Sequence, residues 1–381
     1  MKFTEALQSI ELVIKSGSVP LIVGESGIGK TALIKQFADT YNYYYVSIDG
    51  NLLKEGEIGG LPSVEKYHVN INGKMIEKSR TIYAAYFKFA YIDEILEKNP
   101  HAKILLFIDE INRCEHSVQQ EIMNVILNRE INGYKLHDNV VVVAAMNPSN
   151  KYDEFEDSEY QVIDMDPAQE DRFVWIYMES DVNEWLNWGI KSEKGHPRIH
   201  DDVVNFIASF PEYLHAPNSK ESIKPTPRSW VRVSNIYKEY IKQENTLPLG
   251  ILYNVVKGNV GAAIAQDFLN YIEENKEPII TPEEIFENDH ISEKLKNRIK
   301  AESHSRLYLT ARKTLFYLTN IKNRKMEVNL FSEFLSYYPD DLKMGIMQGI
   351  KSDFTKELYE DFLNNDIFIE AFFSMYNDIE E

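Results

Sequence analysis

The sequence predicts an α/β protein with a parallel sheet, followed by helical regions. Short apolar runs alternate with helix-like segments up to about residue 180, which is the pattern of repeated strand–helix units. The runs are continuously apolar, as is typical of parallel strands covered by helices on both faces. Beyond that point the chain reads as helical. We therefore expect an α/β core at 1–180 and helical regions at 181–275 and 276–381.

Five short apolar runs are predicted to form the strands of the sheet. They lie at 18–23, 43–48, 103–108, 139–145 and 173–178.

Helices are predicted where apolar residues recur at helical spacing. The segment 1–17 carries such a stripe together with several charges, so it reads as an amphipathic helix and not as a signal peptide. The segment 117–127 also has one apolar face, and Ser117 and Gln120 have the spacing of an N-terminal capping box. In the second half, helices are expected over 200–214, 231–243 and 258–276.

Two Asn-Gly pairs predict β-hairpins. Asn72-Gly73 lies in a long insert, residues 51–100, between the second and third strands, and Asn132-Gly133 precedes the fourth strand. Both hairpins could be plain surface turns, which is the commoner meaning of this dipeptide.

Composition limits the function. The 381 residues are 44% hydrophobic and 27% charged, which is ordinary for a globular protein, and no apolar run approaches the length of a membrane helix. The single cysteine, Cys114, excludes an intrachain disulfide and a cysteine-rich zinc site. These features suit the cytoplasm. The net charge of −19 disfavours a large basic surface for nucleic acid.

The stretch "GESGIGKT" fits the phosphate-binding pattern G-x-x-x-x-G-K-[ST] and stands between a predicted strand and a predicted helix. Its glycines let successive backbone N–H groups face one point, and the helix adds the positive end of its dipole. Lys30 is expected to reach the β- and γ-phosphates, and the Thr31 hydroxyl to bind Mg²⁺. The residues predicted to bind nucleotide here are Gly24, Glu25, Ser26, Gly27, Ile28, Gly29, Lys30 and Thr31.

Polar residues follow the third and fourth predicted strands. Asp109 would hold Mg²⁺ through its water shell, and Glu110 would act as general base on the attacking water. Asn147 could orient that water or touch the γ-phosphate. Arg172, just before a strand, and Arg228, near the start of a helix, could stabilise charge on the transferring phosphoryl group.

In this order the motifs resemble the AAA+ ATPases, and "DEINR", the Gln-containing helix and "DPAQEDRF" are similar to the MoxR branch, which carries an insert in helix 2. "TPRSW" resembles the second-sensor motif of the lid. The resemblance covers residues 1 to about 275. It implies a sheet of order 5-1-4-3-2, an α-helical lid over 181–275, a ring that is usually hexameric, and hairpins near the pore of that ring.

The resemblance also implies roles for individual residues. Gly24–Thr31 would be the Walker A loop, and Asp109 with Glu110 the Walker B pair. Asn147 would be sensor one, Arg172 the arginine finger and Arg228 sensor two. The expected ligands are ATP and Mg²⁺.

Three functional hypotheses follow. The first is an ATP-driven remodeller of a protein partner, since members of this branch often act with a von Willebrand factor A-domain protein. The second is a nucleic-acid-dependent motor or a restriction-type NTPase subunit, which the acidic balance disfavours. The third is a nucleotide switch without turnover, and Glu110, Asn147 and the two arginines argue against it.

Overall fold

The chain forms two compact units, Met1–Asp181 and Val182–Glu381, in a computed structural model. Each unit is described by itself. Within the described part of the chain, no helix is long and apolar enough to cross a membrane. The structure describes residues 1–149, 162–193, 196–219, 221–243 and 247–377.

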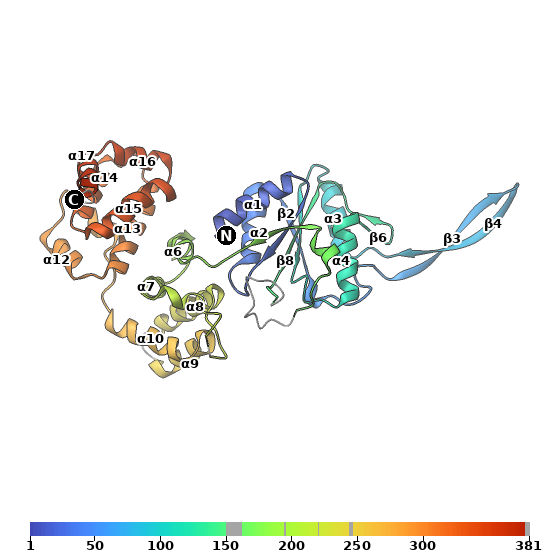
Figure 1. Cartoon of the computed structure of the whole chain (residues 1–381), viewed down its shortest axis with the longest axis horizontal. Coiled ribbons are helices and arrows are strands. Elements are labelled where there is room, and N and C mark those ends of the chain that lie inside the picture. Colours follow the sequence, from blue (N-terminus) through green and yellow to red (C-terminus); the bar gives the residue numbers. More distant parts are fainter. Residues whose placement is uncertain (150–161, 194–195, 220, 244–246, 378–381) are drawn as a thin grey trace. The chain divides into compact units, whose positions relative to one another are not determined.

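The first unit is built on a five-stranded parallel sheet in the order β2-β5-β8-β1-β9 (Figure 1). Counting only these five strands along the chain, the order is 5-1-4-3-2 read from the other edge, so the predicted fold class is confirmed. Each strand lies within one residue of its predicted bounds. The strands are β1 (Val19–Val23), β2 (Tyr44–Asp49), β5 (Ile104–Asp109), β8 (Val140–Met146) and β9 (Phe173–Tyr177).

Side chains alternate along each strand, so the continuously apolar strands give the sheet two apolar faces, and helices cover both. Leu105 and Phe107 of β5 pack with α1 (Phe3–Lys15) and α2 (Lys30–Tyr41). Their neighbours in the strand share the opposite core with α3 (Phe87–Lys98) and α4 (His116–Asn128).

The helix α4 begins one residue earlier than the sequence indicates. Its N-cap is Glu115, whose side chain makes no capping hydrogen bond, so the predicted capping box of Ser117 and Gln120 is wrong. Gln120 Nε2 instead lies 3.2 Å from His116 Nε2, one helical turn away.

Both predicted hairpins form. The first joins β3 (Pro62–Ile71) to β4 (Lys74–Tyr83), and Figure 1 shows it projecting from the α/β unit. The second joins β6 (Glu130–Ile131) to β7 (Tyr134–Lys135). In each turn both the Asn and the Gly have positive φ, which is the conformation of the two-residue turn that Asn-Gly favours. Short helical turns η1 (Gly50–Leu52) and α5 (Pro167–Glu170) complete this unit.

Among its described residues, the second unit is helical apart from one small hairpin. Its first core includes residues from Trp185 to Ile279, and its second core residues from Ile280 to Phe368. Leu309 of α13 (His304–Thr319) packs into the first core. The division into a lid at 181–275 and a region at 276–381 stays a prediction.

The elements of the second unit, in chain order, are α6 (Val182–Ile190), β10 (Ser192–Glu193), β11 (His196–Pro197), α7 (Asp201–Ser209), η3 (Pro211–Tyr213), α8 (Pro227–Lys242), α9 (Leu249–Val260), α10 (Ala262–Glu274), α11 (Pro282–Ile285), α12 (Glu293–Ala301), α13 (His304–Thr319), α14 (Lys325–Ser336), α15 (Asp340–Asp353), α16 (Lys356–Leu363) and α17 (Asp366–Asn377).

Two helix predictions are wrong in the second unit. The segment 200–214 is not one helix, because α7 ends at Ser209 and Pro211–Tyr213 form the separate turn η3. The segment 258–276 contains a break, because Gly261 has φ +95° and separates α9 from α10. The Glu221 carboxylate accepts from the backbone N–H groups of Ala262 and Ala263 at the new N-terminus. A carboxylate at a helix N-terminus compensates the lost helical hydrogen bonds, and the apolar periodicity of the segment does not reveal it.

Candidate nucleotide site

The loop from Gly24 to Gly29 joins the end of β1 to the start of α2. Gly27 and Gly29 have φ of +83° and +110°, which residues with a Cβ rarely adopt. A Cβ on Gly24 would lie 2.7 Å from the carbonyl oxygen of Met178, so the loop also needs a small residue there. The first-turn N–H groups of α2, which lack helical partners, are thereby placed directly behind the loop.

Lys30 is the first residue of α2, and only 7% of it is exposed. Its Nζ donates to the carbonyl oxygens of Gly24 at 2.6 Å and Glu25 at 3.0 Å, and to Oδ1 of Asn147 at 3.0 Å. These neutral acceptors orient the ammonium without cancelling its charge. Among the other loop residues, Ile28 packs its side chain into the core under α1 and α2, so it can offer a ligand only its backbone.

Thr31 and Asp109 meet at the end of β5. The Thr31 hydroxyl donates to Oδ2 of Asp109 at 2.9 Å, and Oδ1 of Asp109 accepts from the backbone N–H of Glu110 at 3.0 Å. A hydroxyl and a carboxylate are the hard oxygen donors that Mg²⁺ prefers, usually alongside water and substrate phosphates. The pair therefore fits a magnesium ion bound together with a nucleotide.

Asn147 follows directly after β8 and is 2% exposed. Its Oδ1 accepts from Lys30, while its Nδ2 has no hydrogen-bond partner within the described part of the protein. A buried donor without a partner costs about 1–3 kcal/mol. A phosphate oxygen or a water molecule beside Lys30 would satisfy it, so this orphaned group fits a bound triphosphate.

Glu110 follows Asp109 in an uncommon conformation, with φ +53°. Its carboxylate is partly exposed and lies 3.7 Å from the Arg113 guanidinium. Residues held in the left-handed region cluster at functional sites, because the surrounding structure must compensate their strain. This backbone conformation changes the direction of the chain immediately after Asp109 and Glu110.

Arg172 lies away from these residues. It stands just before β9, whose Phe173 is in register with Val19 at the start of β1, whereas the glycine loop leaves the far end of β1. Five strand residues span about 16 Å, so Arg172 lies at the amino ends of the strands and the loop at their carboxyl ends. Its side chain is exposed.

Arg228 belongs to the second unit. It is the second residue of α8, after the N-cap Thr226, as the sequence predicts, and it is exposed.

Two contacts near the site were not predicted from the sequence. Asn112 forms a reciprocal pair with the backbone of Asn147, and Glu121 of α4 accepts from the backbone N–H groups of Gly56 and Gly59 at the base of the long hairpin. Asn112 follows the acidic pair by two residues, which is the one sequence signal that could have identified it. Glu121 has no such signal.

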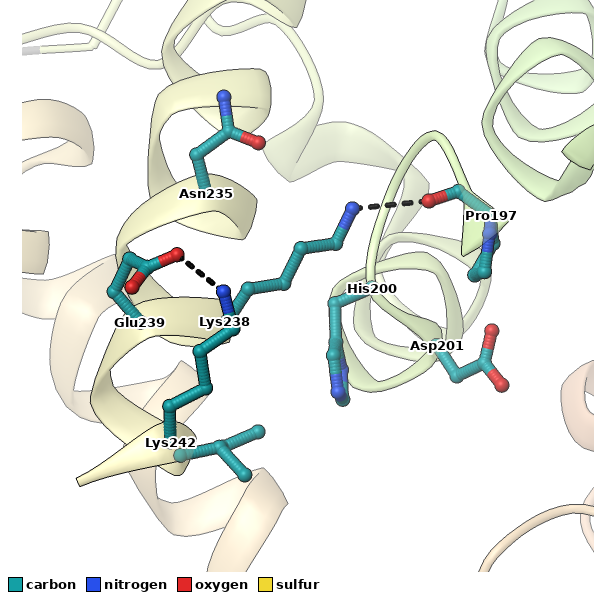
Figure 2. A pocket seen from close by; sticks show the side chains of 8 residues that line it. Pro197, His200, Asp201, Asn235, Lys238, Glu239 and Lys242 are labelled. Atoms are coloured by element: carbon teal, nitrogen blue, oxygen red, sulfur yellow. Dashed lines mark hydrogen bonds and ion pairs between the residues drawn. The ribbon is translucent and has the colours of Figure 1, made fainter. Parts of the chain in front are cut away.

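A pocket of about 560 Å³ lies in the second unit (Figure 2). Its cations have partners in the protein: Lys238 Nζ donates to the carbonyl oxygens of Pro197 and Arg198, and Lys242 pairs with Glu239 at 2.7 Å. We therefore assign no ligand to it. The lining residues are Pro197, His200, Asp201, Asn235, Lys238, Glu239, Ile241 and Lys242.

Comparison with known proteins gives one informative match. Residues 20–156 match the family described as "ATPase family associated with various cellular activities (AAA)". This segment contains the glycine loop, Lys30, Thr31, Asp109, Glu110 and Asn147. No curated protein matches the chain.

Solved structures give a weaker likeness. The Holliday junction branch migration motor RuvB of Thermotoga maritima is 17% identical, with a TM-score of 0.32 over 78% of this chain and 72% of that chain. NtrX of Brucella abortus is 12% identical, with a TM-score of 0.33 over 98% of this chain and 67% of that chain. TM-scores this low do not establish a shared whole-chain architecture. The family match and the five-stranded sheet together mean that residues 20–156 of this chain are an AAA ATPase family domain.

Proposed function

We propose that this chain is an ATP-hydrolysing, ring-forming AAA+ ATPase of the MoxR type that couples turnover to remodelling or maturation of a protein partner. The observation that carries the proposal is the convergence of Lys30, Thr31, Asp109 and Asn147, which come from three separate segments. Their cation, hard oxygen atoms and orphaned amide donor are complementary to a Mg²⁺-bound triphosphate.

Each residue has a role in this proposal. Lys30 binds the β- and γ-phosphates, and Thr31 with Asp109 would hold Mg²⁺, which neutralises phosphate charge when bound. Glu110 takes a proton from the attacking water, and Nδ2 of Asn147 orients that water or the γ-phosphate. Arg113 keeps the Glu110 carboxylate near the site before substrate binds.

A ring completes the site. Arg172 is exposed and lies at the opposite end of the strands from its own glycine loop. It is therefore suited to act on a nucleotide held by a neighbouring copy. In the same proposal Arg228, exposed at the start of α8, has the role of sensor two.

A protein partner fits the long hairpin better than a nucleic acid does. Two of its four cations are paired within it, Lys66 with Glu77 and Arg80 with Glu65. Met75 near its tip is 65% exposed and offers an apolar contact. Tyr134 of the second hairpin is unsuited to gripping a partner, since its ring stacks on Phe89 and its hydroxyl bonds Asp93.

The nucleotide proposal is tested with two variants of the full chain. Lys30→Ala should lose ATP binding, because the phosphate charge loses its counter-ion. Glu110→Gln should keep binding and lose turnover, since the amide fills the same space but cannot take a proton. Binding of a fluorescent ATP analogue and phosphate release separate the two effects. Equal loss of binding in both variants would refute the assigned roles.

The partner class is tested with the wild-type chain. ATPase activity should be unchanged by duplex DNA or single-stranded RNA near 150 mM salt, conditions under which non-specific binding to a few cations is weak. A second test uses variants. Adding Met75→Ser to the Glu110→Gln chain should weaken the capture of a protein partner by that chain, while the basal ATPase activity of Met75→Ser alone stays intact. Several-fold stimulation by a polynucleotide that is lost in a Lys74→Ala, Lys78→Ala variant would favour the nucleic-acid motor instead.

A further inference from the structure

We infer that Asn112 is a positioning residue that fixes Asn147 in its working orientation. The inference rests on the proposed ATPase function and names a residue that acts through another one. Asn112 lies on the connection between β5 and α4, and Asn147 lies just beyond the end of β8. The two residues therefore join the carboxyl ends of adjacent strands.

The contact between them is reciprocal. Asn112 Nδ2 donates to the carbonyl oxygen of Asn147 at 2.8 Å, and the Asn147 backbone N–H donates to Asn112 Oδ1 at 3.3 Å. A primary amide can donate and accept at once. This side chain therefore makes the two hydrogen bonds that a neighbouring strand would make, just beyond the last paired residues of β5 and β8. The preceding residue extends the ladder in the same direction, because Ile111 N–H donates to the Ala145 carbonyl at 3.1 Å.

Burial makes this contact decisive for Asn147. Both asparagines are 2% exposed, so water cannot readily replace the two hydrogen bonds. The backbone of Asn147 is held at both polar atoms and its Oδ1 accepts from Lys30, so its planar amide is fixed, and Nδ2, which has no partner among the described residues, has a set direction. Asn112 thus determines where this free donor points.

A purely structural role for Asn112 would have a different consequence. If Asn112 only tethered the loop between β5 and α4 to the end of β8, its loss would lower the stability of the first unit without selectively lowering kcat. If it positions Asn147, its loss should lower kcat while nucleotide binding through Lys30 and the glycine loop persists. A displacement of about 1 Å in a positioned group can cost about 10²-fold in rate.

The experiment compares Asn112→Leu, which has the same branched shape and number of side-chain heavy atoms but makes neither hydrogen bond, with Asn112→Asp, which keeps only the acceptor for Asn147 N–H. In the full chain, we expect kcat to fall about 10²-fold in Asn112→Leu and less in Asn112→Asp, with KM and the Kd of a fluorescent ATP analogue within about threefold of wild type. Asn139→Leu is the matched control, since Asn139 bonds the Pro100 carbonyl at the opposite end of the sheet. It should keep wild-type kcat.

A double variant decides whether the two residues act as one unit. Asn112→Leu combined with Asn147→Ala should have the kcat of Asn147→Ala alone, because the positioning has nothing left to position. Multiplicative losses, or a wild-type kcat in both Asn112 variants, would overturn the inference. If Asn112→Leu fails to give a cooperative thermal melt, Asn112→Asp decides. Absence of ATPase activity in the wild-type chain would instead refute the proposed function.

Discussion

At the scale of single residues, the glycine loop is shaped by contacts on its protein side as well as by its dihedral angles. The missing Cβ of Gly24 leaves room for the Met178 carbonyl and for the Ile28 side chain, which would lie 2.7 and 2.6 Å from it. Met178 N–H in turn donates to the Val23 carbonyl at 2.8 Å. The loop is therefore held against the chain that leaves β9, and Lys30 depends on this packing for its position.

We expect Gly24→Ala to weaken nucleotide binding about tenfold or more, because a Cβ in this space costs about 1–3 kcal/mol of overpacking and displaces the loop. Gly250→Ala is the matched control: the residue is in α9, and a Cβ there would meet no atom of the described protein within 4 Å beyond its own helix. It should leave binding unchanged and raise stability slightly, since alanine favours helices. Titration with a fluorescent ATP analogue and thermal melts measure both. Unchanged binding in Gly24→Ala would contradict this account of the loop.

At the scale of elements, the long hairpin is fastened to α4 at its base. Glu121 accepts from Gly56 N–H at 3.1 Å and from Gly59 N–H at 3.2 Å, and Asn132 Nδ2 donates to the Gly59 carbonyl at 2.8 Å. A two-stranded hairpin alone is marginally stable in water, and β3 and β4 are almost wholly exposed. Its direction relative to the sheet therefore depends on these few contacts.

Glu121→Gln should loosen this base, because the amide retains one acceptor oxygen where the carboxylate offers two. Hydrogen exchange of the amides at 56 and 59 should accelerate, while exchange in β5 and β8 stays unchanged. Glu94→Gln, at an exposed position of α3, is the control and should alter neither. Protection at 56 and 59 equal to wild type would show that Asn132 alone is sufficient to hold the loop.

In the second unit, His200 caps α7 in its neutral form. Its Nδ1 accepts from the Asp202 N–H at 3.2 Å, and its ring lies edge-on to Tyr237. Figure 2 shows it between α7 and α8, near Lys238 and Asp201. Burial lowers the pKa of His200, and Lys238 and Lys313 act in the same direction, whereas Asp201 and Asp202 oppose them. Folding therefore favours the neutral ring.

The sign of the pH effect follows from this lowered pKa. Stability due to neutral His200 is complete above the unfolded pKa, about 6.5, and is lost as the pH falls through the lower folded pKa. His200→Asn keeps an N-cap acceptor but does not titrate. We expect the Tm of wild type to fall more than that of His200→Asn between pH 7.5 and pH 5. A constant difference in Tm across this range would contradict the assignment.

The sequence predicted those elements whose signals are local. Continuous apolar runs identified the five strands because helices cover both faces of the sheet, although the edge strands β2 and β9 are only partly buried. Asn-Gly identified both turns. Asn72-Gly73 located the turn of the long hairpin but not its ends at Pro62 and Tyr83, since its exposed outer residues are under little constraint to alternate. The break at Gly261 and the pair of Asn112 with Asn147 depend on contacts between distant segments, which leave no periodic trace. The proximity of Lys30, Thr31, Asp109 and Asn147 was predictable, because parallel strands end at one edge of a sheet.

At the scale of the whole molecule, charge is unevenly distributed. The chain has a net charge of −19, yet the hairpin strands and turn at 62–83 carry four Lys or Arg against two Glu. The hairpin is thus a weakly basic element on an acidic chain. In the proposed ring such acidic subunits approach one another, so the free energy of binding a nucleotide between two subunits would have to compensate their repulsion.

The ring proposal predicts that active sites form between subunits. Arg172→Ala and Glu110→Gln should each be inactive, but random mixing at equal amounts places both wild-type groups at about a quarter of the interfaces, so activity should recover in part. Mixing Lys30→Ala with Glu110→Gln is the matched control. Lys30 and Glu110 belong to the same unit of one subunit, so every site then lacks one of them and no activity should return. Co-purification through different tags verifies the mixed rings. Rings that contain both Arg172→Ala and Glu110→Gln subunits yet show no recovery would refute a role for Arg172 at the neighbour's nucleotide.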